Sequence, residues 1–182
     1  MKPVFLALVA ALALGGLARA EVVDSAPDGA TIRESVVINA PAARVWAAMI
    51  RPALWWNSSH TFSGSAANLY VDLGQAGCLC EHTEHGGHVR HLSLVYLDPG
   101  HQLRFEGGMG PLQTTGASGH MDWSLTEADG RTTVTWTYAL GGYFPGGFVA
   151  FAPRVDGMLA EQVAGLKRYV EATPPPRRRS AR

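Results

Sequence analysis

The amino-acid sequence predicts an α+β fold, in which one antiparallel sheet is followed by a single long C-terminal helix. Three observations lead to this class. Residues 30–40 alternate like a strand and run directly into a segment with helical spacing. Residues 68–140 form a series of short alternating segments separated by glycine- and proline-containing turns. Residues 155–170 carry apolar side chains at the period of a helix, and they end the folded part of the chain.

The spacing of apolar residues changes from that of a strand to that of a helix, and this change predicts the first strand and the helices after it. Residues 32–37 alternate in the manner of a strand. Pro41 then fits the first turn of a helix, and the apolar residues from Val45 to Ile50 recur at helical spacing. Residues 51–57, "RPALWWN", predict a second short helix.

The middle of the chain predicts six more strands. We expect them near residues 69–73, 78–83, 89–97, 102–109, 118–126 and 132–140. The breaks between them, such as "GQAG", "DPGH" and "EADGR", are rich in turn residues. Because every connection is short, the strands should run antiparallel as a meander. The last helix then has an apolar stripe that includes Val155, Leu159 and Leu166.

The first twenty residues are organised like a secretory signal peptide. Lys2 supplies a positive start, residues 4–17 form an apolar run, and Ala18-Arg19-Ala20 is an A-x-A cleavage pattern. The run is too short for a comfortable membrane span. We therefore expect cleavage after Ala20 and a periplasmic or secreted protein without an integral membrane span. An uncleaved anchor is the alternative.

The remaining boundaries follow from composition. We expect residues 21–29 to be a loose lead-in, residues 30–172 to form a single domain, and residues 173–182 to be a disordered basic tail. The chain holds 15 Lys and Arg against 15 Asp and Glu, but six of the basic residues lie in the signal peptide and the tail. The predicted domain is therefore acidic, which argues against a nucleic-acid partner.

The order of these elements and three motifs resemble a known superfamily. "INAPAARVWAAMI" at 38–50, "LVYLDPGHQLRF" at 94–105 and "LTEADGRTTVTWTY" at 125–138 are similar to motifs of the START/Bet-v-1-like helix-grip superfamily, SRPBCC. They resemble its bacterial polyketide-cyclase and Hsp90-ATPase-activator-homologue branch. The resemblance implies a curved antiparallel sheet of about seven strands wrapped around the C-terminal helix, with two short helices after the first strand. It also implies a cavity between the sheet and that helix.

Alternation along the strands indicates which side chains face this cavity. Large apolar residues alternate with polar ones in each of the last three strands. We expect the inner face and the helix to supply the apolar contacts to a ligand. These residues are Leu94, Tyr96, Phe105, Trp123, Trp136, Tyr138 and Leu159.

The stretch "GCLCEHTEHGGHVRH" at 77–91 predicts a hairpin with Gly86-Gly87 at the centre of a two-residue turn. With that register, Glu81 and Arg90 share the inner face, whereas His82 and His91 face outward with the cysteines. Glu81 would then be a carboxylate inside an apolar cavity, with Arg90 as the nearest partner. It is both the main polar ligand-binding candidate and the candidate catalytic residue.

Cysteine and histidine in the same hairpin raise two further questions. Cys80, His82 and His91 are candidate metal ligands, but no recognised ligand spacing is present, so we expect no metal and no cofactor. Cys78 and Cys80 could form a disulfide, remain as free thiols or bridge two chains. In a regular strand, residues i and i+2 are about 6.7 Å apart, near the upper limit for a disulfide, so an intrachain bond would need an irregular strand.

Three functions are compatible with the sequence. The first is an exported protein that binds a small hydrophobic molecule, such as a lipid or an aromatic metabolite, in the internal cavity. The second is a cyclase- or hydrolase-type enzyme that uses Glu81 as an acid–base group. The third, by analogy with the co-chaperone branch, is a protein-interaction module. Because no catalytic motif is present, we expect binding rather than catalysis.

Overall fold

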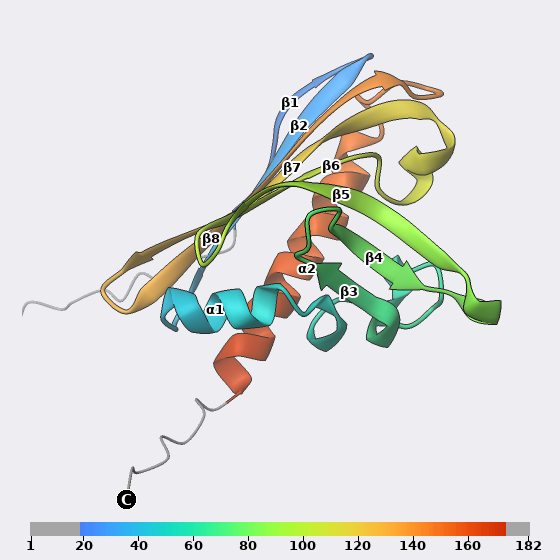
Figure 1. The fold of residues 1–182 in the computed structure, drawn as a ribbon. Helices are drawn as coiled ribbons and strands as arrows, with labels where there is room; N and C mark the ends of the chain where they lie inside the picture. Colours follow the sequence, from blue (N-terminus) through green and yellow to red (C-terminus); the bar gives the residue numbers. More distant parts are fainter. Residues whose placement is uncertain (1–18, 174–182) are drawn as a thin grey trace, which may run out of the picture.

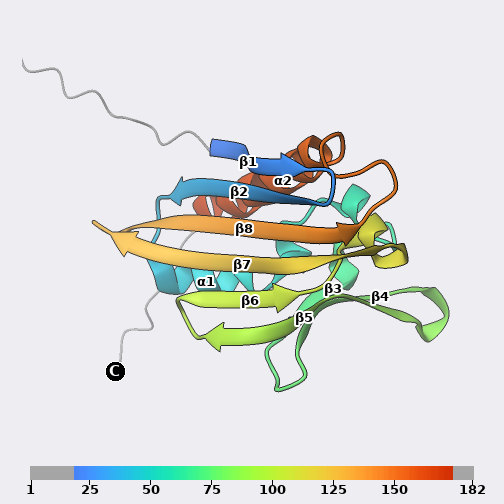
Figure 2. The ribbon, with the colours of Figure 1, turned by 90° about the horizontal axis from the view of Figure 1, so that it is seen from above.

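The computed structural model describes residues 19–173, which form one curved antiparallel sheet and a long helix lying across its concave face (Figure 1). The strand order is β1-β2-β8-β7-β6-β5-β4-β3. Seen from above, the strands lie side by side as a single layer with helix α2 beneath β1, β2 and β8 (Figure 2). This arrangement confirms the predicted α+β helix-grip fold.

The structure contains eight strands, two α-helices and several short 3-10 helices within the described residues. The strands are β1 Arg19–Ala26, β2 Gly29–Ile38, β3 Leu69–Asp72, β4 Cys78–His82, β5 His88–Asp98, β6 Gln102–Glu106, β7 Gly116–Ala128 and β8 Arg131–Tyr143. The α-helices are α1 Ala42–Met49 and α2 Ala152–Ala172. Among residues 19–173, neither helix is long and apolar enough to cross a membrane.

Strand β1 lies where we expected a loose lead-in, so that expectation is wrong. It pairs antiparallel with β2 from Arg19 to Ala26 and adds an eighth strand at the edge of the sheet. The predicted cleavage after Ala20 would leave Glu21–Ala26 of this strand. The rest of the predicted signal peptide and nearly all of the predicted basic tail lie outside the described residues.

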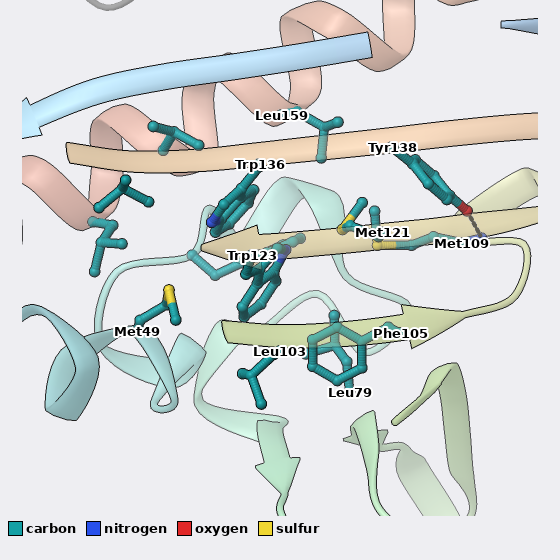
Figure 3. Close-up of a cluster of buried hydrophobic side chains, with 14 of the residues drawn as sticks. Met49, Leu79, Leu103, Phe105, Met109, Met121, Trp123, Trp136, Tyr138 and Leu159 are labelled. Atoms are coloured by element: carbon teal, nitrogen blue, oxygen red, sulfur yellow. Dashed lines mark hydrogen bonds between the residues drawn. The ribbon is translucent and has the colours of Figure 1, made fainter. Parts of the chain in front are cut away.

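The hydrophobic core lies between the sheet and helix α2 (Figure 3). Trp123 of β7 and Trp136 of β8 stack at its centre, with ring centroids 4.3 Å apart and planes 7° from parallel. Leu159 and Val163 of α2 pack against the same inner face and are fully buried. Each such side chain contributes about 1.5–3 kcal/mol by leaving water, so this layer supplies much of the stability.

The second short helix predicted at 51–57 is reduced to a 3-10 turn, Pro52–Leu54. Trp55 and Trp56 follow it and pack onto the ring of Trp136, at centroid distances of 5.8 and 6.3 Å. The Trp55 indole also donates a hydrogen bond to the Ala48 carbonyl (2.8 Å). Tertiary packing of the two indoles therefore takes precedence over continued helix formation.

Candidate functional site

A pocket of ≈ 650 Å³ lies at one end of the core, beside the first turns of α2. Its wall combines the sheet, the start of α2, the segment after α1 and the loop between β6 and β7. The lining residues are Trp56, Ser59, His60, Thr61, Phe62, Leu69, Leu79, His91, Met109, Gly110, Pro111, Leu112, Tyr138, Phe151, Arg154, Val155 and Met158. Most of these residues are apolar. The pocket is open to solvent on the side where Phe62 and Arg154 are exposed.

The segment from Asn57 to Ser63 forms part of this wall and is tied to α2 by polar contacts. The Asn57 backbone N–H donates to the buried Gln162 side-chain oxygen (2.8 Å). His60 Nε2 lies 2.9 Å from the Glu161 carboxylate. These contacts place the segment against the helix and keep the pocket between them.

The β4–β5 hairpin that carries Glu81 differs from the predicted one. Its loop spans Thr83–Gly87, with a 3-10 turn at Glu84–Gly86, and the Thr83 N–H donates to the Gly87 carbonyl (2.9 Å). The register also shifts between the pairs Leu79↔Leu92 and Cys80↔Arg90. His91 is the extra residue of this β-bulge, so it and its neighbour Leu92 both become buried.

This register overturns two of the expected side-chain positions. His91 points inward and is 5% exposed, whereas we expected it on the outer face. Arg90, expected to be the partner of Glu81, is exposed and donates to the Ala76 carbonyl (3.3 Å) instead. The bulge is the physical reason, because one extra residue reverses the alternation on either side of it.

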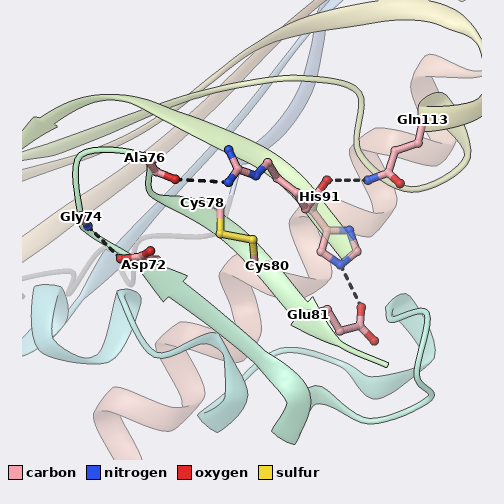
Figure 4. The surroundings of a disulfide bond; sticks show 9 residues. Asp72, Gly74, Ala76, Cys78, Cys80, Glu81, His91 and Gln113 are labelled. Carbon is pink, nitrogen blue, oxygen red and sulfur yellow. Dashed lines mark hydrogen bonds and ion pairs between the residues drawn. A yellow bond between two sulfur atoms is a disulfide. The ribbon is translucent and has the colours of Figure 1, made fainter. Parts of the chain in front are cut away.

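Glu81 is fully buried, and its partner is His91 (Figure 4). His91 Nε2 lies 2.8 Å from Glu81 Oε2. The same oxygen accepts the Phe62 backbone N–H (3.0 Å), and Oε1 accepts that of Ser63. Burial alone would raise the pKa of Glu81, but the hydrogen bonds from Ser63, Phe62 and His91 outweigh it and hold the pKa below its ordinary value. Glu81 is therefore a carboxylate.

The charge of Glu81 determines what His91 offers to the pocket. A carboxylate can only accept hydrogen bonds, so Nε2 of His91 must donate. In the neutral ring Nδ1 is then an acceptor, and it is buried without a hydrogen-bond partner among the described residues. His91 lines the pocket whereas Glu81 does not. Of these two residues, His91 is therefore the one that borders the pocket, although its Nδ1 atom is itself buried.

Of the apolar residues that we expected to contact a ligand, Tyr138 is the one that lines the pocket. Its hydroxyl donates to the Gly107 carbonyl (2.8 Å) and accepts the Met109 N–H (3.1 Å). Burial raises the pKa of this hydroxyl to about 12. With both hydrogen bonds made inside the protein, Tyr138 anchors the loop after β6 (Figure 3). Its side chain also lines the pocket.

The other aromatic candidates lie behind the pocket or outside it. Phe105, Trp123, Trp136 and Leu159 are fully buried and support the wall without forming it. Leu94 is partly buried and packs against the core. The prediction for Tyr96 is wrong. A second irregularity, between Leu94 and Tyr96, turns its ring to the outer face, where it is 45% exposed under the Arg104 guanidinium.

The candidate metal ligands do not come together. Cys80 forms a disulfide with Cys78 across a Cα–Cα distance of 5.4 Å, shorter than in a regular strand. His82 stacks on Tyr70 at 4.7 Å, away from buried His91. Across residues 19–173 no group of three or more His, Cys, Asp or Glu side chains could hold a metal ion. Of the three cysteine states left open, the structure has the intrachain bond (Figure 4).

Several functional residues were not found by sequence reasoning. Phe62 and Ser63 hold Glu81 through their backbone, and such a role leaves no signature in the side chains. Met109–Leu112 form the wall opposite because a loop folds back over the sheet. "MGPL" at 109–112 predicts a turn but not the surface on which the turn lies.

Comparison with known proteins agrees with this architecture. Residues 29–171 match the family described as polyketide cyclase / dehydrase and lipid transport, so the chain belongs to that family. Its members lie within the SRPBCC branch that the sequence motifs resemble. No curated protein matches the chain.

Solved structures share the fold at low sequence identity. A conserved protein of unknown function from Enterococcus faecalis has a TM-score of 0.57 and 13% identity, over 92% of this chain and 84% of that one. CalU16 from Micromonospora echinospora has a TM-score of 0.55 and 14% identity, over 88% and 87%. The di-domain ARO/CYC BexL has a TM-score of 0.54 and 16% identity, over 82% of this chain and 52% of that one. At these identities the similarity shows the fold alone.

Proposed function

We propose that this protein binds a small hydrophobic molecule, such as a lipid or an aromatic metabolite, in the pocket between the sheet and α2. The observation that carries the proposal is the pocket itself, which combines a volume of ≈ 650 Å³ with a mostly apolar wall and one buried polar side chain, His91. Pockets that bind small molecules usually have this size and this composition. Membership of a family described by cyclase and lipid-transport activities also supports it.

A titration with N-phenyl-1-naphthylamine, a neutral probe that becomes fluorescent in apolar sites, tests the proposal. We expect saturable binding at micromolar concentration. The variant Met158→Trp should abolish it, because Met158 lines the pocket and the larger ring fills the space. Gly157→Trp is the matched control, since Gly157 is the residue just before Met158 on α2, is exposed and has open space around it. Equal binding by both variants would place the probe elsewhere and contradict the proposal.

A cyclase- or hydrolase-type activity is the second candidate, and the geometry changes its central residue. Glu81 has both oxygens occupied and does not line the pocket, so it cannot act directly on a ligand. The position of His91 favours this candidate, because it lines the pocket with the Glu81 carboxylate behind it, and a histidine oriented in this way can act as an acid–base group. If turnover exists, His91→Phe should abolish it while leaving the binding of the neutral probe intact.

We also propose export to the periplasm or the exterior, through the signal peptide described above. The Cys78–Cys80 disulfide supports this compartment, because disulfides persist mainly in oxidising environments. Fractionation of cells that express the full chain, with N-terminal sequencing, tests it. We expect the mature protein to begin at Glu21. Intact chain recovered only from the cytosol would contradict the proposal.

A further inference from the structure

Strand β6 is shorter than the strands beside it, so the sheet has a gap on one side of β5. The pairing of β5 with β6 begins at Ser93, which lies opposite Glu106, the last residue of β6. The part of β5 before Ser93, from His88 onward, pairs with β4 and has no strand on its other side within the described residues. Figure 2 shows β5 continuing past the end of β6 towards the β4–β5 hairpin. The unpaired edge of a strand carries backbone N–H and C=O groups that can pair with another chain.

A cleft of ≈ 360 Å³ lies in this gap. Its sides are formed by β5, by the end of β6 and by the loop that leads to β7. It shares two lining residues with the apolar pocket, His91 and Leu112, and is otherwise separate from it. Arg90, Glu106 and Gln113 line the cleft and are exposed, so a ligand can reach their side chains directly from solvent.

Side chains of the loop occupy backbone groups that a strand in the gap would use. The Gln113 side-chain amide donates to the Arg90 carbonyl (3.0 Å), and both residues line the cleft (Figure 4). On the side of β7, the Ala117 N–H donates to the Thr115 hydroxyl (3.1 Å). Each of these side chains satisfies a backbone group that has no strand beside it. Because Gln113 is exposed, the N–H of an incoming peptide can take its place on the carbonyl.

The charges beside the cleft favour one order of charges in an incoming strand. Arg90 and Glu106 are exposed, and neither forms an ion pair within residues 19–173. A strand that continues the direction of β6 runs antiparallel to β5, so it begins beside Glu106 and ends near Arg90. A basic side chain at its start and an acidic one at its end would each meet the opposite charge. Side chains on its other face would lie over Leu92 and Ala117, which are buried and apolar.

We propose that this cleft binds an extended peptide segment of another protein, which adds to β5 as an antiparallel strand, and that Arg90 and Glu106 select the charges at its ends. Strand addition of this kind gains affinity from backbone hydrogen bonds and specificity from side chains. Residues 90–93 of β5 line the cleft, so a segment of about five residues spans it. This peptide site does not depend on ligand binding in the apolar pocket and gives the protein a second binding function.

Two peptides of identical composition test the proposal: acetyl-Lys-Val-Thr-Val-Glu-amide, and its charge-reversed counterpart acetyl-Glu-Val-Thr-Val-Lys-amide. Binding is followed through the backbone amide resonances of residues 90–93 in the unmodified protein. We expect the first peptide to bind about fivefold more tightly, the order of two exposed ion pairs. A version of the first peptide that is N-methylated at its three central residues keeps the side chains but loses the N–H donors. It should bind at least about tenfold more weakly.

The double variant Arg90→Glu/Glu106→Lys exchanges the two charges of the cleft. It should reverse the preference, so that the charge-reversed peptide binds about fivefold more tightly. Its affinity for N-phenyl-1-naphthylamine should be unchanged, because neither residue lines the apolar pocket. Gln113→Ala opens the Arg90 carbonyl and should tighten the binding of the first peptide several-fold. Gln75→Ala is the matched control, since Gln75 is an exposed glutamine outside the cleft.

The outcomes separate this proposal from the hydrophobic pocket. Equal binding of the two peptides by the unmodified protein would overturn it, and so would undiminished binding of the N-methylated peptide. Resonance shifts that leave residues 90–93 unaffected would place the peptide elsewhere and overturn it as well. If the double variant fails to fold, the three peptides on the unmodified protein still decide the question. Failure of N-phenyl-1-naphthylamine to bind would contradict the hydrophobic pocket and leave the peptide site standing.

Discussion

The carboxyl group of Glu34 on β2 interacts with the carboxyl group of Asp156 on α2, between the sheet and the helix. Glu34 is 1% exposed and lies opposite Trp136 in the β2–β8 ladder. Two carboxyl groups can share a hydrogen bond only when one of them is protonated. Burial, and then the hydrogen bond and the charge of Asp156, raise the pKa of Glu34 to about 8.

This pair predicts a stability that falls as the pH rises. The pKa of Glu34 is about 8 in the folded protein and 4.5 as the ordinary value, so the folded state binds more protons between these limits. Stabilisation by the neutral acid is complete below about pH 4.5 and is lost towards pH 8 and above, by roughly 3 to 5 kcal/mol in total. Glu34→Gln keeps the side chain neutral, so its free energy of unfolding should be higher than that of the unmodified protein at pH 9.

Urea unfolding at pH 5, 7 and 9 measures this effect. The difference between Glu34→Gln and the unmodified protein should grow with pH, which separates Glu34 from histidines that titrate in the same range. Glu106→Gln is the control, because Glu106 is exposed on β6. A constant difference across the three pH values would show that Glu34 does not titrate in this window.

The contribution of Glu81 to stability should depend on pH in the opposite direction. Because hydrogen bonds hold its pKa below the ordinary value, its contribution is present above about pH 4.5 and is lost as the pH falls through the folded pKa. Glu81→Leu should lower the free energy of unfolding by about 3 to 5 kcal/mol at pH 7, since His91 and two backbone N–H groups lose their acceptor. Urea unfolding at pH 7 is the measurement, and a loss of less than about 1 kcal/mol would contradict the assigned contacts.

The parts of the fold that could be predicted are those with unbroken alternation. Strands β7 and β8 pair without irregularity over their full length, so the inward positions of Trp123, Trp136 and Tyr138 follow from the sequence. Strand β5 has two irregularities, next to His91 and Tyr96, and both residues were placed on the wrong face. A bulge of this kind requires no particular residue type, so nothing in "HVRHLSLVY" reveals it.

The candidate site could be predicted only in part, because its walls come from segments far apart in the sequence. The sequence identified Glu81 as a buried acid, and burial confirms this. The predicted partner of Glu81, Arg90, was wrong, since the choice between Arg90 and His91 depends on a shift of one residue in the register. The loop at 109–112 and the segment at 57–63 reach the pocket through tertiary contacts, which have no local pattern to read.

Two glycines of helix α2 predict opposite effects of the same substitution. A Cβ on Gly157 would meet no atom within 4 Å, so Gly157→Ala should raise the free energy of unfolding by about 0.5 to 1 kcal/mol through helix propensity. A Cβ on Gly165 would lie 2.5 Å from the Trp55 carbonyl oxygen. Gly165→Ala should therefore destabilise the protein, by about 1 to 3 kcal/mol. Thermal unfolding measures both, and shifts of the same sign would contradict the packing of α2 on Trp55.

The Cys78–Cys80 disulfide predicts a small effect on global stability, because it closes a loop of very few residues. Its sequence separation is 2, and the entropy that a crosslink removes from the unfolded chain increases with loop length. The double variant Cys78→Ala/Cys80→Ala should lose about 1 to 2 kcal/mol in urea unfolding. The unmodified protein should lose a similar amount when dithiothreitol is added, and the double variant should not respond to the reductant. A loss above about 4 kcal/mol would mean that the bond also holds the register of β4, and the position of Glu81 with it.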